Sequence, residues 1–257
     1  MSAICQSHYP ERLRTARALP GIAPLSAGDW LEVDDAFAAQ MTRREALLKD
    51  QKDKVLAHVE DSRPAREEAL AEALKLLAHD ARYELSTSHV RRPDGQTVDL
   101  QGEPLEVLGR LVQEDICLMQ KPEGAAEHVL SAACLCFPAS WTLAEKIGKP
   151  LLAIHDPVAE YDDTLARRVQ RLFDGVQVGR PLWRFNQLWY ADAELHQPRS
   201  VYAPREEVSP IQGDFLRMEK QSIVRLPQTR AVVFSIHTYV LNRADVPEDI
   251  ARSTRSN

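Results

Sequence analysis

Two strand-like runs near the C-terminus constrain the fold of this chain most strongly. Residues 218–226 and 231–240 are separated only by a short turn that begins at Pro227. A proline turn between two such runs predicts a β-hairpin. Residues 116–119 and 129–136 are apolar and predict a second hairpin, around a turn that contains a glycine. Successive hairpins indicate an antiparallel sheet, because a tight turn can join only antiparallel neighbours.

The N-terminal third of the chain predicts helices rather than strands. Apolar residues recur at helical spacing from Phe37 to about His58, with charged residues between them, which indicates one amphipathic helix. A second helix is expected after Ser62 and Pro64, which are typical of an N-cap and a first helical turn. Residues 82–103 are polar and predict a loop or a weak hairpin.

Together these patterns predict an α+β fold in which helices pack on one curved antiparallel sheet of about five strands. A further helix is expected within residues 163–172 and a further strand within residues 178–190. We expect residues 1–103 to form a helical extension packed on a core of residues 104–257, in one continuous domain. A sheet of this kind can enclose a small apolar cavity.

Composition narrows the class of protein. The formal net charge of -6 gives no support for nucleic-acid binding. No apolar run reaches the roughly 18–20 residues that span a membrane, and the N-terminus lacks a signal-peptide pattern. The four cysteines form no C-x-x-C pair, so we interpret them as reduced thiols of a cytoplasmic protein. No Walker A, G-x-G-x-x-G or G-x-S-x-G motif occurs, which argues against a self-sufficient nucleotide or flavin enzyme.

Two histidines are candidates for chemistry. His155 follows an apolar segment and precedes Asp156 and a proline, a position that suits an axial ligand of a haem or metal ion. Asp156 or a backbone carbonyl could orient the ring. The alternative is a turn histidine that bonds only to the backbone. His237 is expected on a half-exposed strand face that it shares with Tyr239, and no histidine has partners at the spacing of a zinc site.

A strictly alternating strand carries further polar candidates. Arg217, Glu219 and Gln221 share one face of this strand, which either meets water or lines a polar cavity. In the second case Glu219 is a buried carboxylate that could accept a proton from an amine or bind a cation. Arg184, on the preceding strand, could hold a carboxylate through a bidentate contact.

Five ordered segments between residues 112 and 239 carry a resemblance to a known family, and the resemblance extends from about residue 30 to residue 245. They are Val112-Gln113-Glu114-Asp115-Ile116-Cys117-Leu118-Met119; Cys136-Phe137-Pro138-Ala139-Ser140-Trp141 with Lys146-Ile147-Gly148; Ile154-His155-Asp156-Pro157-Val158; Trp183-Arg184-Phe185-Asn186; and Arg217-Met218-Glu219-Lys220-Gln221 continuing to Phe234-Ser235-Ile236-His237-Thr238-Tyr239. In the residues and order of these five segments, the chain resembles the DUF3445 family, which contains the haem-binding alpha subunit of haem-dependent oxidative N-demethylase.

The resemblance implies a PAS-like sheet that binds haem b in an apolar pocket and oxidises a small secondary amine with O2. It implies electrons from flavin and iron–sulfur partner proteins, because this chain carries no flavin or iron–sulfur module of its own. The site residues that it implies are the axial ligand His155, the propionate-binding cations Lys146, Arg184 and Arg225, and the distal, substrate-side residues Glu219 and Tyr239.

Two other functions stay open from the sequence. The chain could be a non-catalytic haem-binding sensor or carrier, because a fold does not decide between sensing and turnover. It could also be a PAS-like module that has lost haem and binds a small organic ligand or a partner. The hypotheses differ in whether His155 faces a cavity of haem size and in whether Glu219 is needed for turnover.

Overall fold

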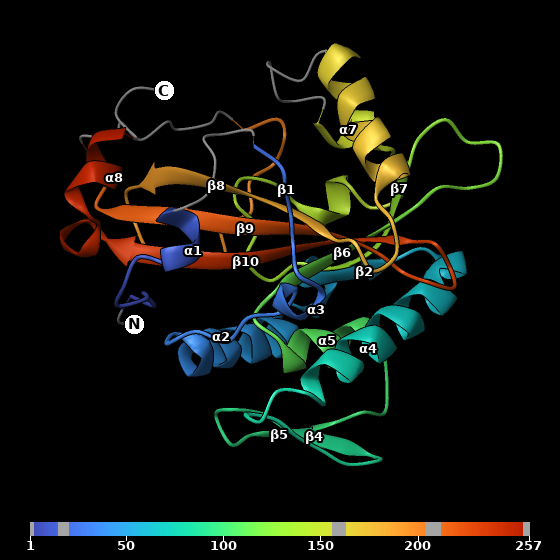
Figure 1. The fold of residues 1–257 in the computed structure, drawn as a ribbon, viewed down its shortest axis with the longest axis horizontal. Coiled ribbons are helices and arrows are strands. Elements are labelled where there is room, and N and C mark those ends of the chain that lie inside the picture. Colours follow the sequence, from blue (N-terminus) through green and yellow to red (C-terminus); the bar gives the residue numbers. More distant parts are fainter. Residues whose placement is uncertain (1–2, 15–20, 156–162, 204–211, 254–257) are drawn as a thin grey trace.

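A computed structural model describes residues 3–14, 21–155, 163–203 and 212–253. In these residues the main element is a seven-stranded antiparallel sheet with the order β1-β8-β9-β10-β6-β7-β2 (Figure 1). Its strands are β1 (Ala23–Pro24), β2 (Leu56–His58), β6 (Asp115–Gln120), β7 (Val129–Cys134), β8 (Leu182–Tyr190), β9 (Phe215–Arg225) and β10 (Val232–Asn242). Both predicted hairpins, β6–β7 and β9–β10, are confirmed.

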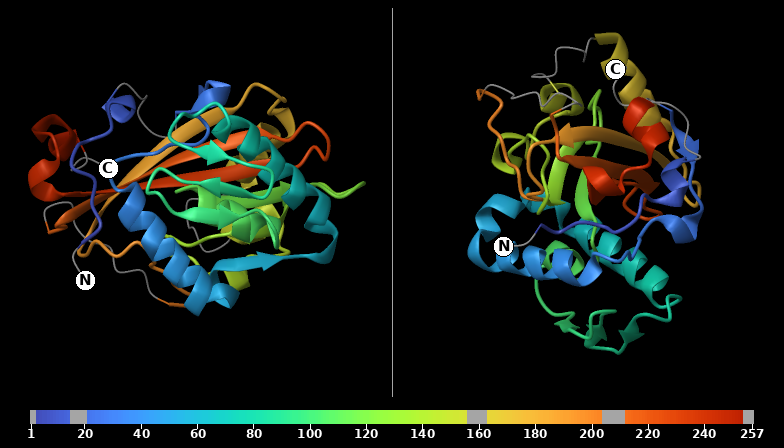
Figure 2. Two further views of the ribbon diagram at one scale, coloured as in Figure 1. Left: turned by 90° about the horizontal axis from the view of Figure 1, so that it is seen from below. Right: turned by 90° about the vertical axis from the view of Figure 1, so that its left-hand side faces the viewer.

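Helices cover both faces of this sheet (Figures 1 and 2). The first face carries α2 (Phe37–Asp50), α4 (Arg63–Leu77) and α5 (Pro104–Leu111), whose apolar side chains pack against alternate residues of the strands, such as Leu118 and Val233. The second face carries the 3₁₀ turn η3 (Leu143–Glu145), α6 (Leu151–His155) and α7 (Asp163–Gly175), which pack against Cys117 and Ile223. The mixed helix and antiparallel-sheet content confirms the predicted α+β class.

The remaining elements are short. They are α1 (Glu11–Arg14), α3 (Lys52–Val55), α8 (Glu248–Ser253), the 3₁₀ turns η1 (Ala27–Asp29), η2 (Glu60–Ser62) and η4 (Arg243–Asp245), and a small sheet of β3 (Glu84–Leu85), β4 (His89–Arg91) and β5 (Thr97–Asp99). The small sheet lies beyond α4 and α5, away from the main sheet (Figure 1). Its β4–β5 hairpin, with Gly95 at a φ of 80°, confirms the weak hairpin expected within residues 82–103.

The single helix expected from Phe37 to about His58 is wrong at its C-terminal end. The chain leaves the helix at Gln51, forms the one-turn α3, and then pairs Leu56–His58 with β7 as an edge strand. The backbone groups of β7 need hydrogen-bond partners, and β2 supplies them. Tertiary pairing therefore outweighs the helical periodicity here. Val59, which follows β2 and continues the helical spacing of apolar residues, is 37% exposed.

A buried ion pair fixes α2 against the sheet. Arg44 is fully buried, and its guanidinium donates to Asp115 Oδ1 at 2.7 Å and to the carbonyls of Gly109 and Glu114 at 3.0 and 2.9 Å. Asp115 in turn accepts the backbone N–H groups of the segment that follows β7, including that of Phe137. One carboxylate thus sets where the chain leaves β7 for the second face of the sheet.

Candidate functional site

A polar cluster crosses the middle of the second face of the sheet. Register places Asn186 of β8 opposite Glu219 of β9, and Glu219 opposite Thr238 of β10. Because side chains two positions apart share a face, the neighbouring Arg184, Arg217 and Gln221 belong to the same surface. We call these six residues the polar cluster: Arg184, Asn186, Arg217, Glu219, Gln221 and Thr238.

Glu219 is the central anion of the polar cluster. Only 7% of the residue is exposed, and Gln221 Nε2 donates to its Oε2 at 3.2 Å. Arg217 holds its guanidinium 3.4 Å from the other carboxylate oxygen and also donates to the carbonyls of Phe137 and Leu195. Of the two sequence interpretations, the water-exposed face is wrong for Arg217 and Glu219, since both are buried.

Three polar atoms of the cluster are buried without a hydrogen-bond partner among the described residues. They are Nε of Arg184, Nε of Arg217 and Oγ1 of Thr238. Burial lowers the pKa of Arg184, and the charge of Glu219 only partly opposes that effect. A buried donor that lacks a partner costs about 1–3 kcal/mol, so such groups in a folded protein commonly await a ligand or water. The cluster can therefore accept a polar or charged group from a bound molecule.

The segment that contains His155 packs on the same face. Leu151 and Ile154 of α6 belong to the apolar cluster that includes Cys117 and Ile223 of the sheet. Lys146 is buried, and its Nζ donates to the carbonyl of Ile154 at 2.5 Å, one residue before His155. His155 is the last residue of α6; its side chain, and the predicted turn at Asp156 and Pro157, lie outside the described residues.

Arg225 lies apart from the polar cluster. It is six residues beyond Glu219 on β9, which is about 20 Å at the rise of a strand. Its nitrogens donate to the carbonyls of Phe173 and Val176, at the C-terminal end of α7, and to that of Arg230. The structure therefore brings Arg184 and Glu219 together and keeps Arg225 at the rim.

Tyr239 lies on the opposite face from Glu219. Register pairs Tyr239 with Met218, whereas Glu219 pairs with Thr238, and adjacent residues of a strand point to opposite faces. The hydroxyl of Tyr239 donates to Glu32, and burial raises its pKa far above its ordinary value, as does the charge of Glu32. The two residues implied for the substrate side therefore do not converge. The alternation of the hairpin sequence, combined with its register, is the signal that separates them.

The face of Tyr239 holds a charged network that sequence reasoning missed. His237 is 1% exposed and bonds through Nε2 to Asp34 at 3.2 Å and through Nδ1 to Glu114 at 3.0 Å. Burial alone would lower the pKa of His237, but hydrogen bonds and charges from the two carboxylates outweigh it and raise the pKa to about 10. The expected half-exposed position is thus wrong: His237 is a buried imidazolium that ties the N-terminal segment to β10.

The fold and the polar cluster together define an α+β protein whose candidate site lies on the same face of the sheet as α6 and α7. Residues 21–255 match the family described as haem-dependent oxidative N-demethylase, alpha subunit-like (HODM_asu-like). The match spans most of the chain, and the chain belongs to this family. Membership confirms the resemblance, and it assigns at family level a haem-dependent oxidative N-demethylase-like role in an assembly of more than one subunit.

Within the described ranges, no group of three or more His, Cys, Asp or Glu side chains is arranged to hold a metal ion. In the same part of the chain, no helix is long and apolar enough to cross a membrane. The four cysteines are free thiols, and Cys117, Cys134 and Cys136 are buried.

Proposed function

We propose that this protein is the haem b-binding, O2-using subunit of an oxidative N-demethylase that acts on a small secondary amine. The observation that carries the proposal is the buried polar cluster around Glu219 in a chain of this family. The proposal includes a PAS-like core of residues 104–257 with an N-terminal extension of residues 1–103. In support of it, the elements η3, α6 and α7 fall between β7 and β8 and cover one face of the sheet.

The described residues of this face suit haem. Leu151, Ile223 and Phe234 belong to one apolar cluster on this face, and a porphyrin needs apolar surroundings of this kind. The unpartnered Nε of Arg184 lies beside that surface and offers a donor to a haem carboxylate. Lys146 is a second cation near the end of α6. We therefore propose His155 as the axial ligand, with Arg184 and Lys146 for the propionates. Arg225 is not part of this proposal, because its nitrogens bond to backbone carbonyls at the rim of the sheet.

The residues of the polar cluster have separate roles in the proposed reaction. Bound haem would supply the oxygen chemistry. Glu219 attracts the cationic form of a secondary amine and can hold or accept its proton at a carboxylate oxygen. Gln221 and Arg217 fix the orientation of that carboxylate. Tyr239, on the other face, has no part in binding the amine and instead positions the N-terminal segment through Glu32.

We propose flavin and iron–sulfur partner proteins as the source of the electrons for O2 reduction, because the described family is that of an alpha subunit, which works with other subunits. A cytoplasmic location would supply such reductants and keep the four thiols reduced. Neither nucleic acid nor a membrane is a proposed partner.

Replacing His155 by alanine is expected to abolish the Soret band of the protein that is expressed with haem precursor. Loss of the axial ligand removes the iron–protein bond that holds haem in the pocket. The absorption spectrum of the purified chain measures the effect, with His89→Ala as the control because His89 lies exposed on β4. An unchanged Soret band in His155→Ala would overturn the ligand assignment, and a colourless wild type that fails to take up haemin would overturn the proposed function.

Replacing Glu219 by glutamine is expected to lower turnover of a secondary amine about 100-fold, with haem content unchanged. This magnitude is at the low end of what a positioned acid or base contributes. Steady-state kinetics of the haem-loaded protein with a competent reductase measure the change, and Glu84→Gln, on the small sheet, is the matched control. Equal turnover in both variants would exclude Glu219 from the reaction, and wild-type haem binding without any turnover would favour a sensor.

A further inference from the structure

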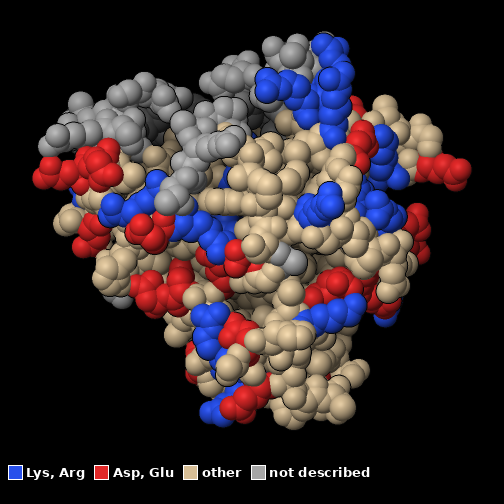
Figure 3. Space-filling model, viewed as in Figure 1, with Lys and Arg blue, Asp and Glu red and all other residues tan. Residues whose placement is uncertain are grey.

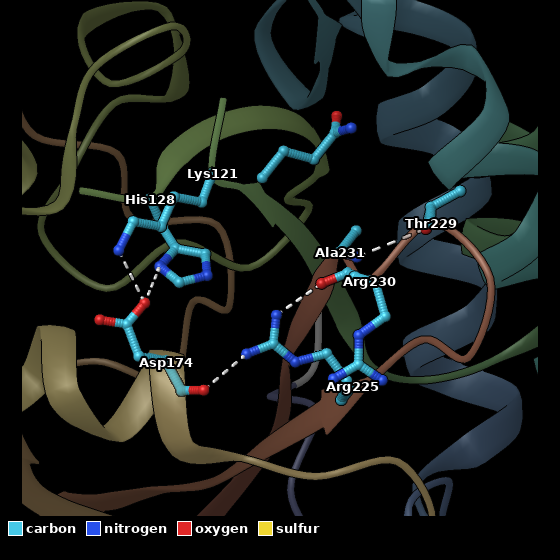
Figure 4. Close-up of a pocket in the computed structure, with 8 residues that line it drawn as sticks. Lys121, His128, Asp174, Arg225, Thr229, Arg230 and Ala231 are labelled. Carbon is cyan, nitrogen blue, oxygen red and sulfur yellow. Dashed lines mark hydrogen bonds and ion pairs between the residues drawn. The ribbon is translucent and has the colours of Figure 1, made fainter. Parts of the chain in front are cut away.

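A second site lies at the rim of the sheet, where the β9–β10 turn meets the C-terminal end of α7. A pocket of about 260 Å³ is lined there by Lys121, His128, Asp174, Arg225 and Arg230, among others (Figure 4). It is slightly smaller than the roughly 300–1,000 Å³ of pockets that hold drug-sized ligands, so it suits a small group. None of the polar-cluster residues lines it.

The charges of this rim pocket are unbalanced. Lys121, Arg225 and Arg230 carry three positive charges, and Asp174 is the one carboxylate among the lining residues, which leaves two positive charges in excess. Lys121 donates to Asp174 at 2.9 Å, so that pair is largely self-neutralising. The two guanidinium groups are close enough for Arg230 to lower the pKa of Arg225, after burial, which is the larger cause. An anion between them would relieve this repulsion.

The tautomer of His128 directs a hydrogen-bond donor into the pocket. The backbone N–H of His128 donates to Oε1 of Gln170 at 3.1 Å, which turns the amide so that its Nε2 donates to His128 Nδ1 at 2.9 Å. Burial lowers the pKa of His128, as do the charges of Arg225 and Lys121, while Gln170 and Asp174 act in the opposite direction. Because Gln170 Nε2 donates to Nδ1, the proton of the neutral ring sits on Nε2. Among the described residues Nε2 has no hydrogen-bond partner, and it lies on the side of Arg225 and Arg230 (Figure 4).

One residue that lines this pocket has a strained backbone. Arg230 has a φ of 61°, in the left-handed region that non-glycine residues rarely adopt. Its carbonyl accepts from Arg225 at 2.5 Å, which anchors the turn, while its own guanidinium makes no hydrogen bond or ion pair among the described residues. A strained residue that lines a pocket is typical of ligand sites. Exposed arginines continue the positive surface along α7, with Lys and Arg side chains prominent over that helix in Figure 3.

We propose that the rim pocket binds the phosphate group of a small molecule, free phosphate or a phosphomonoester. The dianion would accept from Arg230 and from Nε2–H of His128, and it would neutralise the two excess positive charges. Guanidinium groups suit phosphate because their planar donors match its oxygens. This site is independent of the haem proposal, since it shares none of the residues that hold haem or amine there.

Calorimetric titration of the purified full-length chain with inorganic phosphate, at constant ionic strength, tests the proposal. We expect saturable one-to-one binding that Arg230→Asn weakens about tenfold, the effect of losing one charge-assisted hydrogen bond. Asparagine tolerates a positive φ, so this variant keeps the turn. Arg180→Asn is the matched control, because Arg180 is exposed and lies outside the pocket.

Parallel titration with a simple phosphomonoester separates the two sources of the group. Tighter binding of the ester than of phosphate would assign a phosphorylated metabolite, and equal or weaker binding would assign the free ion; both support a phosphate site. Absence of saturable binding for both probes, or equal weakening by Arg230→Asn and Arg180→Asn, would overturn it. Nitrogen-15 spectra of the histidines add a direct readout, since bound phosphate must shift Nε2 of His128 and leave the exposed His79 unchanged.

Discussion

Replacing Arg44 by alanine is expected to lower the free energy of unfolding by about 3–5 kcal/mol, the usual cost of breaking a buried ion pair from one side. Asp115 would keep its charge at a position that is 1% exposed, with its strongest partner gone. The carbonyls of Gly109 and Glu114 would also lose their donor. Removal of a side chain that lies over the ring of Phe137 would leave a void in addition.

Urea denaturation followed by circular dichroism measures this effect. Arg43 is the matched control, because it is the preceding residue of α2 and makes a partly exposed pair with Glu194. Arg43→Ala should cost no more than about 1 kcal/mol. Arg44→Lys keeps the charge and loses the planar fork, so it should fall between the two and remain folded if the alanine variant does not. Equal unfolding midpoints for the Arg43 and Arg44 variants would show that the buried pair does not stabilise the fold.

The fold was predictable where the local sequence pattern and the tertiary contacts favour the same secondary structure. Strand-like runs and turn residues predicted the β6–β7 and β9–β10 hairpins, and alternation predicted that Arg217, Glu219 and Gln221 share one face of β9. Helical periodicity failed after Gln51, because pairing of β2 with β7 is a tertiary contact that local spacing does not contain. Sequence patterns therefore predicted the strands well and the edges of the sheet poorly.

The candidate site was predictable only in part, for the same physical reason. The polar face around Glu219 follows from strand alternation, but its burial depends on segments far along the chain, such as Phe137, whose carbonyl binds Arg217. The partners of His237 are farther still, because Asp34 and Glu114 precede it by 203 and 123 residues. No local pattern distinguishes a half-exposed strand histidine from one buried between two carboxylates.

Protonation of His237 is expected to make the stability of the fold depend on pH above neutrality. The ordinary pKa of histidine is about 6.5, and in the folded chain that of His237 is about 10. The folded state therefore holds a proton that the unfolded state loses, and the stability gained is complete below about pH 6.5 and lost as pH rises through about 10. At 1.36 kcal/mol per pKa unit, the loss between pH 6.5 and 9 is about 3 kcal/mol.

At acid pH, Asp34 of the same network makes the stability of the fold fall as pH decreases. Burial would raise the pKa of Asp34, but hydrogen bonds from His237, Gln113 and Gln6 and the charge of His237 lower it below its ordinary value. Its contribution is present above about pH 4, the unfolded value, and is lost as pH falls through the lower folded pKa. The network should therefore stabilise the fold most between about pH 4 and 6.5, with stability falling on either side.

Chemical denaturation of wild type and His237→Gln at a series of pH values separates this network from other titrating groups. Glutamine can bond to one carboxylate but cannot carry the proton, so the variant should be less stable at pH 6.5 by several kcal/mol. The difference between the two proteins should shrink by about 3 kcal/mol towards pH 9. His79→Gln, at the exposed end of α4, should leave the wild-type profile unchanged. A pH-independent difference would mean that His237 stabilises the fold through packing alone, and that the bonds from Asp34 and Glu114 hold a neutral ring.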